Sequence, residues 1–139
     1  MTALHEAARG YLHVPFFHQG RSRSGLDCVG LVVSALNDCG HSVSDFSAYG
    51  RNPYQGQLED RLCAVLGQPI DKSAMAPGDV VAIDFAGVIR HVGIVGEYPD
   101  GGLSLIHTCD SVGRVTEHRI DKKWDRRIKK VWRPAEGGV

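Results

Sequence analysis

Cys28 is placed where a cysteine could act as a nucleophile, because it opens a predicted helix. Asp27, directly before it, is a preferred N-cap residue, and the apolar run over 29–36 predicts a helix that is buried on most sides. Unpaired N–H groups and the helix dipole concentrate positive potential at such a helix start, which favours the thiolate over the thiol. We therefore expect Cys28 to be the most reactive of the four cysteines. The alternative is a structural cysteine buried in the core.

Two histidines in predicted strands could complete the chemistry that such a nucleophile needs. His91 lies within the apolar run 88–95, where a strand would hold its ring rigid, and Gly93 on the same face leaves room for another group. His107 lies in the alternating segment 103–109, on the apolar face of that strand. If the two strands pair, His107 can orient His91, and His91 can serve as the general base for the cysteine. The alternative for each ring is a structural histidine held by a local hydrogen bond.

The elements that must position these residues are helices in the first half of the chain and strands in the second. Helical spacing of apolar residues predicts three helices, at 2–11, 27–39 and 57–66. Polar composition with glycine, serine or proline predicts loops at 19–25 and 41–56. Turn signals separate the predicted strands, at 80–83, 88–95, 103–109, 112–120 and 128–132. Helices followed by consecutive strands predict an α+β fold with an antiparallel sheet.

The size and charge of the chain exclude several classes of protein. A chain of 139 residues with 42% apolar and 23% charged residues fits one globular domain, taken as residues 1–139. Sixteen basic residues balance sixteen acidic ones, which argues against a nucleic-acid binder. No apolar run reaches the roughly 18 residues that cross a bilayer, so we expect no membrane insertion, and the first ten residues do not resemble a signal peptide. The cysteines match no zinc framework, so no metal is expected.

Several segments resemble motifs of the NlpC-type papain-like cysteine peptidases, over roughly residues 5–133. Residues 25–32, Gly-Leu-Asp-Cys-Val-Gly-Leu-Val, resemble the nucleophile motif of that family, in which serine usually follows the cysteine. Residues 91–95, His-Val-Gly-Ile-Val, resemble its base motif. Three further features are similar to the family: the strand start at 77–81, the third polar residue in 106–107, and Trp124 before a basic terminal strand.

The resemblance implies a papain-like NlpC fold, in which N-terminal helices, including the nucleophile helix, pack on an antiparallel sheet. It also implies a cysteine endopeptidase that cleaves amide bonds in peptidoglycan stem peptides without a metal or cofactor. By analogy Cys28 attacks the carbonyl carbon, His91 transfers protons and His107 orients His91. The backbone N–H of Cys28 would supply one donor to the oxyanion.

One departure from the family concerns a tyrosine that usually lies twelve residues before the nucleophile, where this chain has Phe16. Residues 15–18 are expected to be extended, so Phe16 and His18 would share a face. We hypothesise that His18 supplies a donor near the oxyanion in place of the missing hydroxyl; the alternative is a surface loop histidine. The predicted oxyanion and substrate site therefore comprises Phe16, His18, Asp27 and Cys28.

Residues 18–23, His-Gln-Gly-Arg-Ser-Arg, and the valine after Cys28 resemble the phage-encoded branch of the family. This implies a virion tail component that is made in the host cytoplasm and bound to phage tail or baseplate proteins. Two alternatives remain open. One is a structural tail-tip component with little or no activity, and the other is a thiol acyltransferase or lipid hydrolase on the same scaffold.

Two further sets of polar residues are given structural interpretations. The basic run over 122–130 is expected to be a solvated turn and an edge strand; the alternative is a contact with an anionic wall polymer or an acidic partner. Four remaining histidines are interpreted as surface or local-structure residues: His5, His13, His41 and His118.

Overall fold

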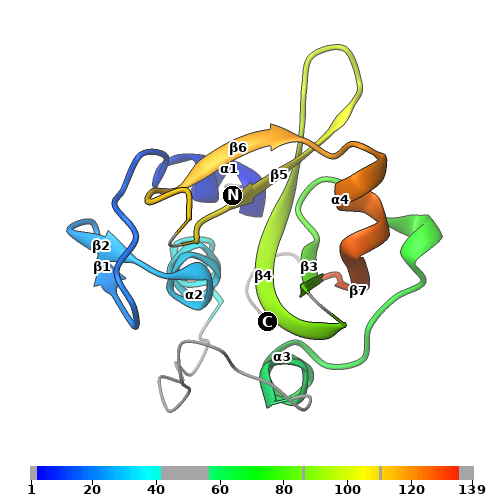
Figure 1. The fold of residues 1–139 in the computed structure, drawn as a ribbon, viewed down its shortest axis with the longest axis horizontal. Helices are drawn as coiled ribbons and strands as arrows, with labels where there is room; N and C mark the ends of the chain where they lie inside the picture. The colour runs from blue at the N-terminus through cyan, green and yellow to red at the C-terminus, as the bar shows by residue number, and fades with distance from the viewer. Residues whose placement is uncertain (1–2, 42–56, 86, 110, 135–139) are drawn as a thin grey trace.

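A computed structural model describes residues 3–41, 57–85, 87–109 and 111–134 (Figure 1). The first half of the chain contains α1 (Leu4–Arg9), β1 (Arg21–Ser22), β2 (Gly25–Leu26), α2 (Cys28–Asp38), α3 (Gln57–Leu66) and the 3₁₀ turn η1 (Lys72–Ala74). The second half contains β3 (Val80–Phe85), β4 (Val88–Glu97), β5 (Leu103–His107), β6 (Thr116–Arg119), α4 (Lys122–Arg127) and β7 (Ile128–Trp132). No helix in these ranges is both long and apolar enough to traverse a bilayer.

The second half of the chain forms a five-stranded sheet in the order β6-β5-β4-β3-β7, with every neighbouring pair antiparallel. The predicted α+β fold with helices packed on an antiparallel sheet is confirmed. β4 is the central strand, and Figure 1 shows it curving strongly beside the end of α2. β7 lies at one edge of the sheet, as expected for the end of the basic run.

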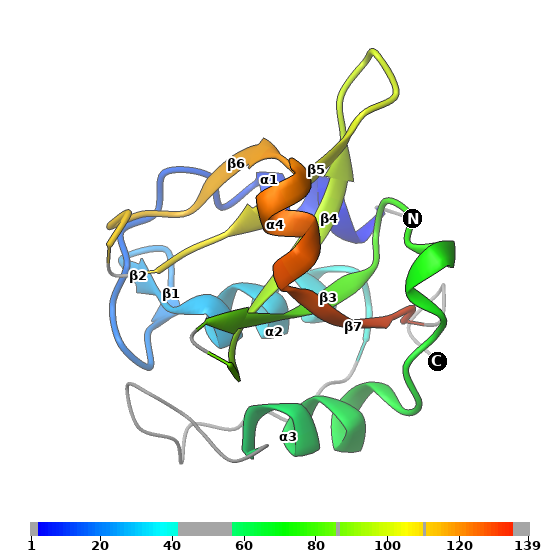
Figure 2. The ribbon, with the colours of Figure 1, turned by 45° about the vertical axis from the view of Figure 1, so that its right-hand side comes forward.

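Alternation along the strands gives the sheet two apolar faces. Val80, Ala82, Val92 and Ile94 face the main core, together with buried side chains of α1, α2 and α3. The opposite face carries a second core cluster, which Trp124 of α4 and the segment around η1 partly cover. Figure 2 shows α4 lying across this face, whereas α2 lies behind the sheet. The central strand is therefore buried on both sides, which explains its nearly continuous apolar sequence.

Several elements differ from the sequence expectation, among them the strand predicted at 112–120, which is shorter as β6 (Thr116–Arg119). Residues 19–25, predicted as a loop, contain the short hairpin β1–β2. The basic run begins with α4 rather than a turn, because the side chain of Asp121 caps the helix by accepting from the N–H of Trp124 at 2.9 Å. The first helix is shorter than predicted and spans only Leu4–Arg9. The loop predicted at 41–56 lies, apart from its first residue, outside the described residues.

Candidate active site

The start of α2 is fixed by the carboxylate of Asp27, which is only 3% exposed. One oxygen, Oδ1, accepts from the N–H of Gly30 at 2.8 Å and from Nη1 of Arg21 at 3.0 Å. The other, Oδ2, accepts from the N–H of Gln19 at 2.8 Å. The predicted N-cap is therefore confirmed, and the same side chain ties the β1–β2 hairpin to the start of the helix.

The segment that carries Phe16 runs alongside the residues just before the nucleophile candidate. The N–H of Phe17 donates to the carbonyl of Leu26 at 3.0 Å, and the N–H of Leu26 donates to the carbonyl of Pro15 at 3.0 Å. These bonds place Phe16 beside Leu26, two residues before Cys28. The expectation of extended backbone is correct for residues 15–17.

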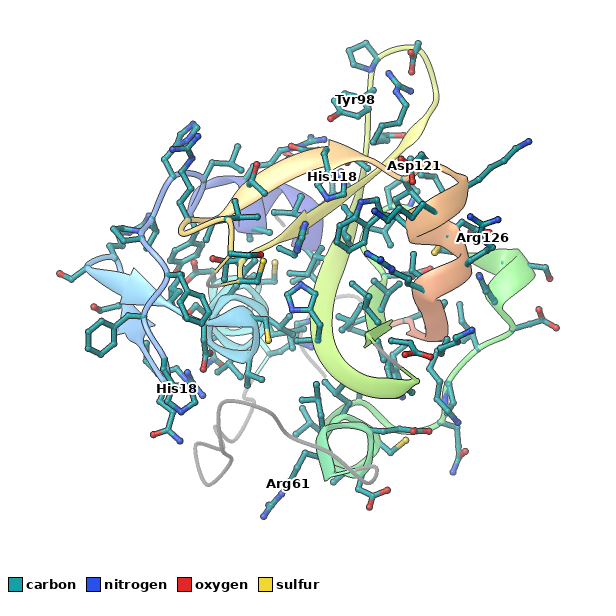
Figure 3. The ribbon with its side chains drawn as sticks, viewed as in Figure 1. His18, Arg61, Tyr98, His118, Asp121 and Arg126 are labelled. Carbon is teal, nitrogen blue, oxygen red and sulfur yellow. The ribbon has the colours of Figure 1, made fainter. Side chains whose placement is uncertain are left out.

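His18 does not continue this extended segment. The N–H of Gly20 donates to the carbonyl of Phe17 at 2.8 Å, so the chain turns at His18 and Gln19. His18 is half-buried, and Figure 3 shows it next to the β1–β2 hairpin, at the periphery of the molecule. The alternation that would put His18 on the same face as Phe16 is therefore absent, because it requires extended backbone at both residues.

Burial around the sulfur and, to a smaller extent, the negative charge of Asp27 raise the pKa of the Cys28 thiol to about 12. Backbone N–H groups of Val92 and Val29 stabilise the thiolate, but their effect is smaller than that of burial. Cys28 as a residue keeps some exposed surface, so the burial concerns the immediate surroundings of the sulfur. Burial and the carboxylate of Asp27 therefore outweigh the helix start, contrary to the expectation that this position favours the thiolate.

The two histidines expected to be neighbours are in direct contact. Nε2 of His91 lies 2.8 Å from Nδ1 of His107, and the rings meet edge to face. Gly93 makes this contact possible, because a Cβ at that position would lie 3.2 Å from the Cβ of His107 and 2.7 Å from Cδ1 of Leu105. The space predicted beside Gly93 is thus occupied by the second histidine.

Both rings are almost fully enclosed, with 4% of His91 and 1% of His107 exposed. Burial and, to a smaller extent, the positive charge that His118 carries when it is protonated lower the pKa of His91 to about 4. Burial also lowers the pKa of His107 to about 2, with additional contributions from His91 and His118. At neutral pH both rings are therefore uncharged, and each has one N–H donor and one acceptor nitrogen.

The start of α2 brings Cys28 to the stretch of β4 that carries His91. The backbone N–H of Val92, directly after His91, is one of the groups that act on the sulfur of Cys28. The pairing of β4 with β5 runs from Glu97 to Ile94, so it ends before Val92. The start of α2 thus meets β4 where the pairing with β5 has ended.

A third histidine, His118, extends the chain of rings, and the sequence reasoning missed it. Its Nε2 lies 2.8 Å from Nε2 of His107, and its Nδ1 lies 3.0 Å from the backbone carbonyl of Arg119. The ring of Trp124 packs against both histidines, with centroid distances of 5.1 Å to His107 and 4.8 Å to His118. Figure 3 shows His118 on β6, on the side where α4 packs. The feature that places His118 near His107 is the register of β6 with β5, in which His118 is paired with Leu105, two residues from His107.

Within the described ranges, no group of three or more histidine, cysteine, aspartate or glutamate side chains is arranged to hold a metal ion. The rings of His91, His107 and His118 contact one another in sequence rather than converging on a common point.

Comparison with known proteins places this geometry in a family. The model of the NlpC/P60 family matches residues 13–133. The chain belongs to the NlpC/P60 family. Members of this family are cysteine peptidases, so a cysteine at the start of a helix and a histidine on the central strand are in keeping with its chemistry.

Two solved NlpC/P60 structures share the fold of this chain. A structure from Staphylococcus aureus subsp. aureus Mu50, described as similar to a lipoprotein of the NLP/P60 family, has a TM-score of 0.65 and 18% identity. The match covers 94% of this chain but only 40% of that protein. The NlpC/p60 domain of the peptidoglycan hydrolase SagA has a TM-score of 0.64 and 21% identity, with 94% of this chain and 95% of that domain covered. A comparison with curated proteins found no match.

Proposed function

We propose that this NlpC/P60 domain is a peptidoglycan hydrolase, a cysteine endopeptidase that cleaves amide bonds in the stem peptides of the cell wall. The observation that carries the proposal is the 2.8 Å contact between the buried rings of His91 on β4 and His107 on β5. The residue after His91, Val92, acts through its backbone on the sulfur of Cys28. Membership of a cysteine peptidase family and the shared fold with the SagA domain support the same reaction. Cys28 is the nucleophile, His91 the general base and His107 the group that orients it.

The first step must generate a thiolate from a neutral thiol. Because the pKa of Cys28 is about 12 and that of His91 about 4, the resting pair is uncharged, and the proton moves only as the reaction proceeds. As the sulfur bonds to the carbonyl carbon of the scissile amide, the thiol proton passes to His91. The carbonyl π electrons move to the oxygen, and the backbone N–H of Cys28 donates to this oxyanion.

The second step releases the amine. The oxyanion reforms the carbonyl, the C–N bond breaks, and the leaving nitrogen takes the proton from His91, which leaves a thioester on Cys28. Water then attacks the thioester carbonyl with His91 as base, the C–S bond breaks to release a carboxylic acid, and the proton held by His91 returns to the sulfur and restores the thiol. In both steps Nδ1 of His107 accepts from Nε2–H of His91, which stabilises the transient imidazolium.

The absence of a tyrosine hydroxyl at Phe16 leaves the second oxyanion donor unassigned. The hypothesis that His18 supplies it rests on its place directly after residues 15–17, which run beside the residues that precede Cys28, and not on a face shared with Phe16. His18→Ala should then slow turnover by about 10²-fold or more, and Phe16→Tyr in that background should restore part of the rate. Turnover of His18→Ala at the wild-type rate would remove His18 from the site.

The decisive experiment is digestion of purified cell wall. Wild-type protein should release stem-peptide fragments with new amino termini, Cys28→Ala should release none, and Cys39→Ala at the other end of α2 is the matched control. Circular dichroism of the variants tests for an intact fold. No digestion by the folded wild type would contradict the proposal and favour a structural tail-tip role. Cleavage of lipid esters but not wall peptides would favour the acyltransferase or lipid hydrolase.

We also propose that the protein is carried to the wall on a phage tail, as a virion component made in the host cytoplasm. The support is limited to the resemblance of residues 18–23 and Val29 to the phage-encoded branch. Purification from the native source should recover the protein bound to tail or baseplate proteins. Recovery only as a free secreted monomer would contradict this part of the proposal.

A further inference from the structure

The three histidines His91, His107 and His118 form a continuous hydrogen-bonded chain that ends on a backbone carbonyl. We propose that His118 is a positioning residue, which sets the tautomers of His107 and His91 and thereby decides which nitrogen of His91 accepts a proton. This proposal rests on the proposed function, in which His91 is the base. His118 itself does not touch the reacting atoms in this scheme.

The direction of the chain follows from its last contact. A backbone carbonyl oxygen can only accept, so Nδ1 of His118 must carry the hydrogen in its 3.0 Å contact with the oxygen of Arg119. In the neutral form of His118, in which the proposed chain operates, the other nitrogen is then an acceptor. Nε2 of His118 therefore offers its lone pair to His107.

The same logic passes along the remaining two rings. Nε2 of His107, 2.8 Å from the acceptor on His118, must carry a hydrogen, which leaves Nδ1 of His107 as the acceptor. Nε2 of His91, 2.8 Å from that Nδ1, must then be the donor. Nδ1 of His91 is left with the lone pair, so this is the nitrogen that can take the thiol proton. The single backbone carbonyl of Arg119 thus determines which nitrogens donate and which accept in all three rings.

The burial of the two inner rings supports this order. Because the pKa values of His91 and His107 are lowered to about 4 and about 2, both stay neutral at pH 7 and each must use one nitrogen as acceptor. A charged inner ring would donate from both nitrogens and would break the sequence of donors and acceptors. His118, which is less buried than either, closes the chain on the side of β6.

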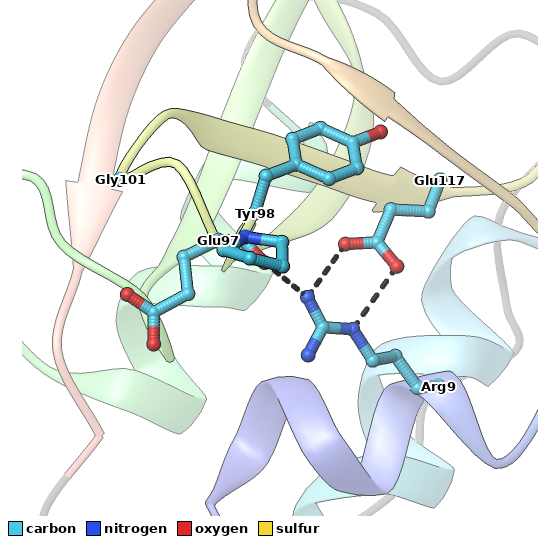
Figure 4. Close-up of a pocket in the computed structure, with 6 residues that line it drawn as sticks. Arg9, Glu97, Tyr98, Gly101 and Glu117 are labelled. Atoms are coloured by element: carbon cyan, nitrogen blue, oxygen red, sulfur yellow. Dashed lines mark hydrogen bonds and ion pairs between the residues drawn. The ribbon is translucent and has the colours of Figure 1, made fainter.

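The position of His118 is fixed by contacts on both faces of β6. On its own face, the ring of Trp124 covers His118 and His107 together. On the other face, the neighbouring residue Glu117 accepts from Nε and Nη2 of Arg9 at 3.0 and 2.8 Å, and from Oγ of Ser104 at 2.5 Å (Figure 4). β6 is an edge strand with only β5 beside it in the sheet, so this anchor to α1 restrains the backbone that carries His118.

Two variants of similar size separate a tautomer-setting role from simple packing. In His118→Gln the side-chain amide oxygen can still accept from Nε2–H of His107, whereas His118→Leu fills the space without an acceptor. We expect His118→Gln to keep nearly wild-type kcat/KM on wall peptides. His118→Leu should lose about 2- to 12-fold, the usual worth of one hydrogen bond, and the loss should lie in kcat rather than KM.

The closing experiment reads the ring nitrogens directly, by long-range ¹H–¹⁵N NMR of the ¹⁵N-labelled protein near pH 7.5. In the wild type, Nε2 of His91 and His107 and Nδ1 of His118 should carry the hydrogens. His118→Gln should keep this pattern at His91 and His107, and His118→Leu should show mixed tautomers at His107. Hydrogen on Nδ1 of His107 in the wild type, or a His118→Leu variant with unchanged pattern and rate, would overturn the proposal. The NMR readout needs no turnover, so the expected pattern in a protein that digests no wall would contradict only the proposed function.

Discussion

Lowering the pH from 7 to 5 should destabilise this domain through its two most buried histidines, His91 and His107. Both have pKa values far below the 6.5 of an unburied histidine, because burial penalises the imidazolium. At pH 5 the unfolded chain therefore binds protons that the folded chain does not. By linkage, their contribution to stability is complete above about pH 6.5 and is lost as the pH falls towards the folded-state values.

The magnitude follows from the folded-state pKa values of about 4 and about 2. At pH 5 both rings remain neutral in the folded protein. In the unfolded chain each ring has a pKa of about 6.5, so pH 5 lies about 1.5 pH units below the point at which it takes up its proton. At about 1.4 kcal/mol per unit, each histidine removes about 2 kcal/mol from the free energy of unfolding, and the two together about 4 kcal/mol. A domain whose total stability is about 5–15 kcal/mol would lose a substantial part of it.

Urea unfolding followed by tryptophan fluorescence at pH 7 and pH 5 measures this loss, because Trp132 is fully buried in the core. The matched control is His107→Asn, in which the difference between the two pH values should fall to about 2 kcal/mol. Glu117, whose pKa is lowered from 4.5, contributes mainly below pH 5 and so leaves this window nearly clear. A wild-type difference below about 1 kcal/mol, or an equal difference in both proteins, would refute the reasoning.

Three further predictions concern the nucleophile, the base and their packing. His91→Ala should slow iodoacetamide labelling of Cys28 by about 10²-fold near neutral pH, because a thiol whose pKa is raised by burial needs a base to form the thiolate. Equal labelling rates in the variant and the wild type would contradict this dependence. On wall peptides, kcat/KM should stay level between about pH 5 and pH 8 and fall as His91 is protonated near pH 4. A fall in kcat/KM that begins near pH 6.5 would show that burial does not set the pKa of His91. Gly93→Ala should cost about 1–3 kcal/mol in urea unfolding, because the added Cβ would lie 2.7 Å from Leu105 and 3.2 Å from the Cβ of His107; wild-type stability would show that the site can relax.

The sequence was sufficient for features that depend on local order. Asp27 before an apolar run predicted both the N-cap and the start of α2, because capping needs only a side chain and the backbone three residues on. The contact between His91 and His107 was also accessible, since alternation places each ring on a face and a short turn makes the two strands neighbours. The family motifs pointed to the same fold, which the NlpC/P60 match and the solved structures support.

Features that depend on tertiary surroundings were not accessible. The helix start alone suggested a thiolate at Cys28, but the pKa is set mainly by what encloses the sulfur, including β4 from a distant part of the chain. His118 was dismissed because its role depends on the register of β5 with β6, which an irregular connection leaves undetermined in the sequence. The turn at His18 was missed for a related reason, since Pro15 restricts only its own backbone and that of the residue before it and does not constrain the backbone at His18.

The strand order has a consequence for how the site is assembled during folding. β3, β4 and β5 are joined by short turns, so the hairpin that brings His91 to His107 needs only local contacts and is expected to form early. The contact of α2 with β4 closes a loop that contains all of residues 39–87, and loop closure of this length costs more chain entropy. A partly folded chain would therefore hold its pair of histidines before Cys28 is enclosed. In that intermediate the thiol lacks the burial that keeps it protonated, so oxidative damage to Cys28 should accumulate during folding rather than in the finished protein.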